Sequence, residues 1–415
     1  MILLINPPFY RFLGLEQDYV PLSLMAVGSK MSADGEDVLI KNMEVGGNHY
    51  AGYSERSDHY DLYTKSLVDD KNIIWQELRK LLSDLHPDKV GINVLNVKYK
   101  SAIKIIDICR EFDIPVIVGG NHPTLDPDAY PLDVEVFCGE YESSGGRLNH
   151  LDDTPLPDYD LLLDKYSPNG YGHILSSRGC PFKCSFCASK MMWGHKVTYK
   201  SIDRIIIEMS NVYERFHTDY FTFWDETFTA NNKRLTEFCL KYDIPALWRC
   251  DTRADSITDD MISMMRAAGC GQMSIGLESG DNEILRSVNK GETTEDFKRA
   301  AEILNRHAIQ WKAYMIIGFP GDTEETILSS IEFVKSLQPF RITLSFFTPY
   351  QGTDLYDETK ALGLINDNYD MSMFSHQSPH NYFCPKISKE RYFELRNLVS
   401  KDIDNYNKKA LESWK

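Results

Sequence analysis

One stretch of the sequence indicates the fold most directly: Ser177-Arg178-Gly179-Cys180-Pro181-Phe182-Lys183-Cys184-Ser185-Phe186-Cys187. The other motifs of the sequence are interpreted in relation to it. Three cysteines fall within eight residues, spaced C-x₃-C-x₂-C, and a glycine and a proline flank the first of them. Glycine adopts backbone conformations that other residues avoid and proline fixes one, so a tight loop is predicted here. Thiolates at this spacing can reach one metal centre, and sulfur ligands select zinc, copper(I) or iron–sulfur clusters. A cluster with one ligand per iron and only three cysteines would keep one iron open to a further ligand.

A structural zinc site and three merely buried cysteines are the alternatives. Structural zinc needs a fourth ligand at short spacing, but the next cysteine is Cys239 and the nearest histidines are His173 and His195. The nine cysteines are odd in number and no secretory signal precedes them. They therefore indicate a reducing, cytoplasmic compartment, which suits an oxygen-sensitive cluster.

Composition bounds the class of protein. A chain of 415 residues is long enough for two or three domains of about 150 residues each. No run of about 18 apolar residues is present, so no membrane association is expected. The net charge of −16 argues against nucleic-acid binding, which needs clustered Lys and Arg. The acidic surface and the absence of a peptide-recognition motif favour a small-molecule substrate.

Residues 1–145 alternate short apolar runs with helical patterns, which predicts a doubly wound, Rossmann-like parallel sheet. The strands are expected at Ile2–Ile5, Val38–Lys41, Val90–Val94, Val116–Val118 and Val134–Phe137. Helices are expected between them at Leu22–Met31, Ile73–Leu85 and Ala102–Phe112, and a loop or short insertion at 46–70. Ligands of such sheets bind beyond the carboxyl ends of the strands, where Asn6-Pro7-Pro8 and Gly119-Gly120 lie.

Residues 146–170 are acidic and punctuated by proline, which predicts an extended linker. From 171 to 355 strands alternate with helices, the rhythm of a partial, six-stranded (β/α)₆ TIM-type barrel. The barrel strands are expected at Gly172–Ser176, Tyr220–Trp224, Ala246–Cys250, Gln272–Gly276, Lys312–Ile317 and Ile342–Phe347. Residues 356–415 are predicted to form a helical extension with an apolar stripe from Tyr392 to Tyr406.

The C-x₃-C-x₂-C loop with an aromatic before its last cysteine resembles the cluster loop of the radical S-adenosylmethionine (SAM) enzymes. The resemblance implies a 4Fe-4S cluster on Cys180, Cys184 and Cys187, whose open iron chelates the amino and carboxylate groups of SAM. Reductive cleavage of SAM then gives a 5′-deoxyadenosyl radical that abstracts hydrogen from substrate. An electron donor such as flavodoxin or ferredoxin is implied as a partner.

Four further motifs, each at the end of a predicted barrel strand, resemble the family's SAM-binding positions. They are Trp224-Asp225-Glu226-Thr227-Phe228, Asp251-Thr252-Arg253-Ala254-Asp255, Ser274–Gly280 and Ile316–Thr323. The implied contacts are Asp225 or Glu226 to the ammonium, Arg253 to the carboxylate, Glu278 to the ribose, and the backbone of Ile316, Gly318 and Phe186 to the adenine. An exposed acidic loop, and a salt bridge from the arginine to Asp225 or Asp255, are the alternatives. Substrate contacts from Lys312, Tyr314, Arg249, Phe347 or Tyr350 compete with packing roles for the same residues.

Parts of the first 145 residues resemble the cobalamin-binding domain that precedes the radical core in one large subfamily. The matching stretches are Leu3–Pro8, Pro21–Leu24, Val118–Pro123 and Cys138–Glu142. Cobalamin contacts are implied for Asn6, Pro7, Gly119, Gly120 and His122. The D-x-H-x-x-G signature that gives cobalt a histidine is absent, and 143–150 is short where the family has a helix and a hairpin. A sheet domain that only caps the barrel is therefore the alternative.

These features together predict a radical SAM enzyme acting on a small molecule, with cobalamin-dependent methyl transfer as its outcome. The alternative is a cobalamin-independent rearrangement, dehydration, epimerisation or oxidation, for example of a sugar or antibiotic precursor. A non-enzymatic, zinc-binding interaction protein is the remaining hypothesis.

Overall fold

The computed structural model describes residues 1–15, 17–46, 53–366 and 370–413. Within these ranges the chain divides into two compact units, and the division falls after His173. The first, called the sheet unit, contains residues 1–46, 55–173 and 371–373. The second, called the barrel unit, contains residues 53–54, 174–366, 370 and 374–413.

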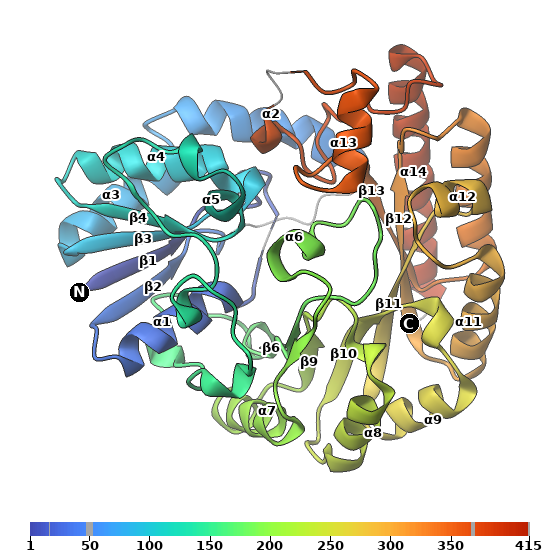
Figure 1. Ribbon diagram of the computed structural model, residues 1–415, viewed down its shortest axis with the longest axis horizontal. Coiled ribbons are helices and arrows are strands. Elements are labelled where there is room, and N and C mark those ends of the chain that lie inside the picture. The colour runs from blue at the N-terminus through green and yellow to red at the C-terminus, as the bar shows by residue number, and fades with distance from the viewer. Residues whose placement is uncertain (16, 47–52, 367–369, 414–415) are drawn as a thin grey trace. The chain divides into compact units, whose positions relative to one another are not determined.

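The sheet unit is a five-stranded parallel sheet with the order β2-β1-β3-β4-β5 (Figure 1). Its strands are β1 (Ile2–Asn6), β2 (Val38–Asn42), β3 (Lys89–Asn93), β4 (Val116–Gly119) and β5 (Glu135–Val136). Its helices are α1 (Leu22–Ala33), α2 (Tyr53–Val68), α3 (Ile73–Leu85), α4 (Tyr99–Arg110) and α5 (Asn121–Leu125). The strand order reverses between β1 and β3, as in doubly wound folds, and the predicted fold class is confirmed.

Strand β1 shows why this sheet forms. Leu3 and Ile5 lie in one apolar core and Leu4 lies in another, because successive side chains point to opposite faces. A strand that is buried on both faces has apolar residues at successive positions, so a continuous apolar run in the sequence predicts such a strand. Helix α3 begins where Asn72 accepts a hydrogen bond from the Ile74 backbone N–H at 3.0 Å.

The prediction of a loop at 46–70 is wrong for most of this segment, because Tyr53–Val68 form helix α2. Residues 47–52 of the predicted loop lie outside the described residues. The helix buries Tyr60 and Tyr63, whose rings pack against Phe9 at centroid distances of 6.3 and 4.8 Å. The buried face of α2 consists largely of tyrosines, and the rest of the segment is rich in polar residues. The apolar periodicity that predicts a helix is therefore weak in this segment.

The barrel unit is a six-stranded sheet in chain order, β6-β9-β10-β11-β12-β13, and every ladder from β9 to β13 is parallel. Its strands are β6 (His173–Ile174), β9 (Tyr220–Phe223), β10 (Leu247–Thr252), β11 (Cys270–Glu278), β12 (Gln310–Ile317) and β13 (Arg341–Phe346). Two short antiparallel strands, β7 (Ser177–Arg178) and β8 (Thr198–Tyr199), follow β6. Within the described ranges β6 and β13 do not pair, so the predicted partial (β/α)₆ barrel is confirmed.

Helices lie outside the barrel strands in Figure 1. They are α7 (Ile202–Phe216), α8 (Asn232–Lys241), α9 (Asp259–Ala267), α11 (Thr294–Arg306), α12 (Glu324–Ser336) and α14 (Lys389–Ser413). The barrel unit also contains three shorter helices, α6 (Ser189–Trp193), α10 (Asn282–Ser287) and α13 (Asp354–Ala361). Helix α14 buries Tyr392, Leu395, Val399 and Ile403, so the predicted helical extension is present. Among the described helices, none combines the length and apolar character that crossing a bilayer requires.

Candidate active site

The three clustered cysteines lie in the loop from Gly179 to Cys187, called the cysteine loop. Gly179 has φ +99°, a left-handed conformation that glycine adopts without strain. The loop closes on itself where the Cys187 N–H donates to the Cys184 carbonyl at 3.2 Å. Ser185 fixes it from two sides, since its N–H donates to Val288 at 3.0 Å and its carbonyl accepts from Leu355 at 3.1 Å. Segments that follow β11 and β13 therefore hold the loop in place.

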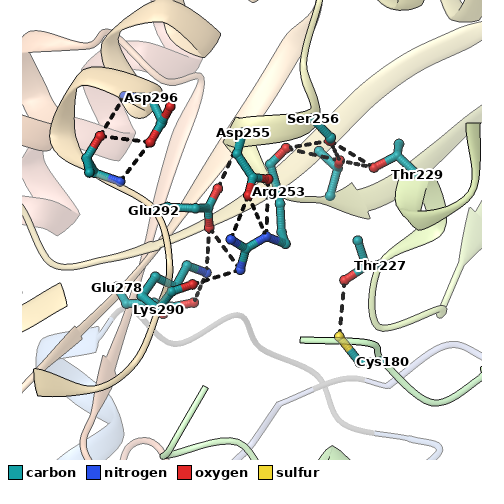
Figure 2. Close-up of polar contacts among 12 residues, drawn as sticks. Cys180, Thr227, Thr229, Arg253, Asp255, Ser256, Glu278, Lys290, Glu292 and Asp296 are labelled. Carbon is teal, nitrogen blue, oxygen red and sulfur yellow. Dashed lines mark hydrogen bonds and ion pairs between the residues drawn. The ribbon is translucent and has the colours of Figure 1, made fainter. Parts of the chain in front are cut away.

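The three thiols are half-buried, and none forms a disulfide. Burial raises the pKa of Cys184, and it raises that of Cys187 to about 11. Cys180 Sγ lies 3.6 Å from Thr227 Oγ1, in the segment that follows β9 (Figure 2). No three His, Cys, Asp or Glu side chains of the described ranges gather closely enough to hold a single ion. In a cluster each thiolate binds its own iron, so three cysteines on one loop are a donor set for a [4Fe-4S] cluster with one iron open.

The two carboxylates after β9 have different surroundings. Asp225 is buried and accepts hydrogen bonds from the Ser176 N–H at 3.2 Å and Oγ at 2.8 Å, and from Ser177 Oγ. Glu226 Oε1 accepts from Ser189 Oγ at 3.2 Å, whereas its Oε2 is buried and has no hydrogen-bond partner among the described residues. Burial raises the pKa of both carboxyls. Of the two, Glu226 offers the oxygen that a bound cation can use.

Most N–H groups of the Arg253 guanidinium, which follows β10, already donate hydrogen bonds within the protein. Its Nε and Nη2 donate to Asp255, the latter at 2.8 Å, and its Nη1 donates to the Lys290 carbonyl at 2.9 Å. Its guanidinium carbon lies 3.9 Å from the ring centroid of Phe182 in the cysteine loop. The salt bridge to Asp255 considered from the sequence is therefore present, while Asp225 bonds to serines instead. A role in holding the SAM carboxylate stays a prediction for Arg253.

Glu278, at the end of β11, belongs to a buried charge network (Figure 2). The Lys290 ammonium lies 3.4 Å from Glu278 and 3.3 Å from Glu292, and Arg253 Nη1 lies 3.4 Å from Glu292. Glu278 has φ +68°, an unusual conformation for a residue with a side chain, at a register shift in the ladder. A Cβ on Gly276 would lie 2.3 Å from the Glu278 carboxylate, so that glycine makes room for it.

The end of β12 forms an apolar edge that ends in a tight turn at a glycine. Ile316 and Phe186 pack in the same cluster, and the ring of Phe186 lies 5.7 Å from that of Phe319. Gly318 has φ +90°, and its N–H donates to Asp322 at 2.8 Å. Burial raises the pKa of Asp322 to about 6. Adenine contacts from Phe186, Ile316 and Gly318 stay predictions on this geometry.

In the sheet unit, two of the residues predicted to contact cobalamin are already engaged. Asn6 donates to Asn42 at 2.8 Å and accepts from the buried Lys98 at 2.8 Å. His122 is buried, lies 2.8 Å from the Tyr130 hydroxyl and stacks on Tyr99. Pro7 is buried as well, whereas Gly119 and Gly120 are half-buried at the carboxyl end of β4. The backbone of those two glycines is the part of the predicted set that a ligand can reach.

Residues 174–334, which contain the cysteine loop and the ends of β9 to β12, match the radical SAM superfamily. Residues 174–334 therefore form a radical SAM domain. An uncharacterized methyltransferase of Pyrococcus horikoshii is 27% identical over 364 residues, covering 77% of this chain and 79% of the relative. The bacteriochlorophyllide d C-12(1)-methyltransferase of Chlorobaculum tepidum is 26% identical over 302 residues, 66% of each chain.

A solved structure shares the fold over almost the whole chain. The radical SAM methyltransferase TsrM of Kitasatospora setae, determined with cobalamin and a [4Fe-4S] cluster bound, superposes with a TM-score of 0.68. The match covers 96% of this chain and 90% of TsrM at 16% sequence identity. The fold of this radical SAM enzyme is therefore that of TsrM.

Lys290 and Glu292 were not among the site residues predicted from the sequence. They lie in the turn after α10, outside the ends of the strands where site residues were sought. The signal available was Lys290-Gly291-Glu292, two opposite charges around a glycine that has φ +71°. Such triplets are common in exposed turns, so their burial is visible only in three dimensions.

Proposed function

We propose that this radical SAM enzyme holds a 4Fe-4S cluster on Cys180, Cys184 and Cys187 and catalyses cobalamin-dependent methyl transfer to a small molecule. One observation carries the proposal. Three thiols, none in a disulfide, lie on one loop; Cys180 is 3.6 Å from Thr227, and Ser189, just after the loop, donates to the neighbouring Glu226. The buried Oε2 of Glu226 has no hydrogen-bond partner among the described residues. Buried polar atoms of native proteins are normally hydrogen-bonded, and an exception calls for an explanation. The ammonium of SAM supplies the missing donor.

The chain's own residues bind and orient the cofactor. Glu226 accepts a hydrogen bond from the SAM ammonium, and Glu278 accepts hydrogen bonds from the ribose hydroxyls. Arg253 donates hydrogen bonds to the SAM carboxylate from the N–H groups that its protein partners leave available. The apolar edge around Phe186 and Ile316 excludes water from the adenine. Bound there, the cluster supplies an electron to the SAM sulfonium and cobalamin supplies a methyl carrier, chemistry that side chains lack. A flavodoxin or ferredoxin is the proposed electron donor.

Support for cobalamin comes from the relatives and from the sheet unit. Two relatives are named methyltransferases, and the solved structure with this fold holds cobalamin. Gly120 has φ +104°, and a Cβ there would lie 2.4 Å from Asn93 Oδ1, so the backbone runs close to β3 at the carboxyl edge. We assign cobalamin contacts to the Gly119–Gly120 backbone. His122 is not assigned as a cobalt ligand, because Tyr130 and Tyr99 already hold its ring.

A cobalamin-independent radical reaction is the second candidate. It is favoured by the internal hydrogen bonds of Asn6 and His122, which remove two of the five predicted contacts. In that case the sheet unit would have a structural role or bind substrate.

Anaerobic purification with cobalamin supplied during expression tests the proposal. Cluster reconstitution should give about four irons and four sulfides per chain, and about one cobalamin. Cys184→Ser should lose the iron, whereas Cys138→Ser, at an exposed cysteine of the sheet unit, should keep it. Iron without cobalamin would select the second candidate, and a colourless zinc protein would contradict both.

A further inference from the structure

Polar side chains form a row across the middle of the barrel sheet. In the ladders, Asp251 of β10 lies opposite Ser274 of β11, and Ser274 lies opposite Lys312 of β12. Neighbouring strands lie about 4.8 Å apart, so these three side chains are adjacent on one face of the sheet. Arg249 precedes Asp251 by two residues and therefore projects from the same face. The alternate residues, such as Trp248, Met273 and Trp311, are buried and apolar.

Several donors in this row lack partners among the described residues. Lys312 makes neither a hydrogen bond nor an ion pair there, although it is half-buried. Arg249 donates from Nε to Thr222 Oγ1 at 2.9 Å, and its terminal nitrogens form no further hydrogen bond with any described residue. Ser274 is fully buried, and its Oγ has no hydrogen-bond partner within 3.5 Å in the part of the chain that the structure describes. Asp251 and Tyr314 lie beside that hydroxyl, and hydrogen bonding from it lowers the pKa of each.

The charges of the row do not balance. Burial and the neighbouring Arg249 lower the pKa of Lys312 to about 8, while Asp251 opposes that shift. Burial raises the pKa of Asp251 itself, which weakens the negative charge opposing the two cations. Two cationic side chains therefore face a single carboxylate in a desolvated place. Buried charge without compensation is costly, and an anionic ligand removes that cost.

We propose that Arg249, Ser274 and Lys312 form the subsite that binds an anionic oxygen group, a carboxylate or a phosphate, of the substrate. The guanidinium terminal nitrogens, the ammonium and the hydroxyl together present donors to two or three oxygens, the pattern by which proteins recognise both groups. The inference rests on the proposed function in one respect, because it takes the ligand of this subsite to be the substrate of the radical reaction.

Anion titration of the full-length, cluster-reconstituted protein tests the subsite without knowledge of the substrate. Inorganic phosphate is followed by ³¹P line broadening, and acetate by saturation-transfer difference. Lys312→Met should weaken anion binding about tenfold or more, since hydrogen bonds to charged groups are worth about 1.5–3 kcal/mol. Lys312→Arg should retain most of the affinity. The control is Lys298→Met, at an exposed lysine on α11, which should leave binding unchanged.

The two probes distinguish the sources of the anion. Saturable binding of phosphate alone indicates a phosphate ester, binding of acetate alone indicates a carboxylate, and binding of both supports the shared chemistry. Equal binding by the wild type, Lys312→Met and Lys298→Met would overturn the proposal. Iron content is measured on the same samples, which separates the two proposals. If the protein holds about four irons but its anion binding does not depend on Lys312, only the subsite proposal is refuted. If anion binding depends on Lys312 but the protein holds no iron, only the cluster proposal is refuted.

Discussion

Replacing Lys290 by methionine tests the buried charge network directly. The Lys290 ammonium is the cation paired with Glu278, at 3.4 Å, and it also lies 3.3 Å from Glu292. Removing one partner of a buried ion pair costs about 3–5 kcal/mol, because the other charge stays buried. Arg253 remains 3.4 Å from Glu292, so that carboxylate keeps a cation and the lower end of the range applies. Lys290→Met should lower the free energy of unfolding by about 3 kcal/mol, roughly a hundredfold in the equilibrium constant.

Urea denaturation followed by tryptophan fluorescence measures the effect, because Trp248 and Trp311 are buried in the strands of the barrel unit. The matched control is Lys298→Met, whose exposed pair with Glu295 should contribute less than about 1 kcal/mol.

The loss in Lys290→Met should depend on pH. Burial raises the folded-state pKa of the Glu278 carboxyl, and loss of the ammonium raises it further. A group with a raised folded pKa binds its proton more tightly in the folded state, so acid favours folding. The deficit of the variant should therefore shrink as the pH falls from 7 toward 5. A deficit below about 1 kcal/mol, or one that does not change with pH, would refute the buried-pair reasoning.

Three further predictions concern single side chains. Gly318→Ala places a Cβ 2.4 Å from the Tyr392 hydroxyl oxygen at φ +90°, and should cost about 2–3 kcal/mol in thermal unfolding. Gly363→Ala, at φ +70° with no atom within 4 Å, should cost about 1 kcal/mol, and equal losses would contradict the steric part of the argument. Glu226→Gln should weaken SAM binding about ten- to hundredfold by calorimetry, and unchanged affinity would remove Glu226 from the site. Acetylation of Lys312, followed by peptide mass spectrometry, should show a midpoint near pH 8, and a midpoint near the ordinary value of about 10.4 would contradict its burial.

The sequence predicted the architecture because burial leaves a periodic signal. Strands buried on both faces, such as Ile2–Asn6, appear as apolar runs, and parallel strands require a helix between them. Placing the polar motifs at the carboxyl ends of those strands followed from the same topology. All six barrel strands fall at the predicted places, and their ends differ from the predicted ends by at most two residues.

The types of residue in the site could be predicted from the sequence. The hydrogen-bond and ion-pair partners of those residues were harder to predict. Whether Asp225 or Glu226 faces a ligand depends on Ser176 and Ser177, which lie nearly fifty residues earlier and bond to Asp225. Lys290 reaches Glu278 from a turn twelve residues later, through a long side chain whose burial has no sequence signature. Contacts of this kind are fixed by tertiary packing, so local pattern does not reveal them.

Electron paramagnetic resonance of the reduced protein tests the central claim most directly, namely that Cys180, Cys184 and Cys187 hold a cluster that binds SAM. The account predicts a 4Fe-4S signal whose g values shift when SAM is added. The signal should be absent in Cys184→Ser and present in Cys138→Ser. A signal that SAM does not change, or one that survives the loss of Cys184, would contradict the account.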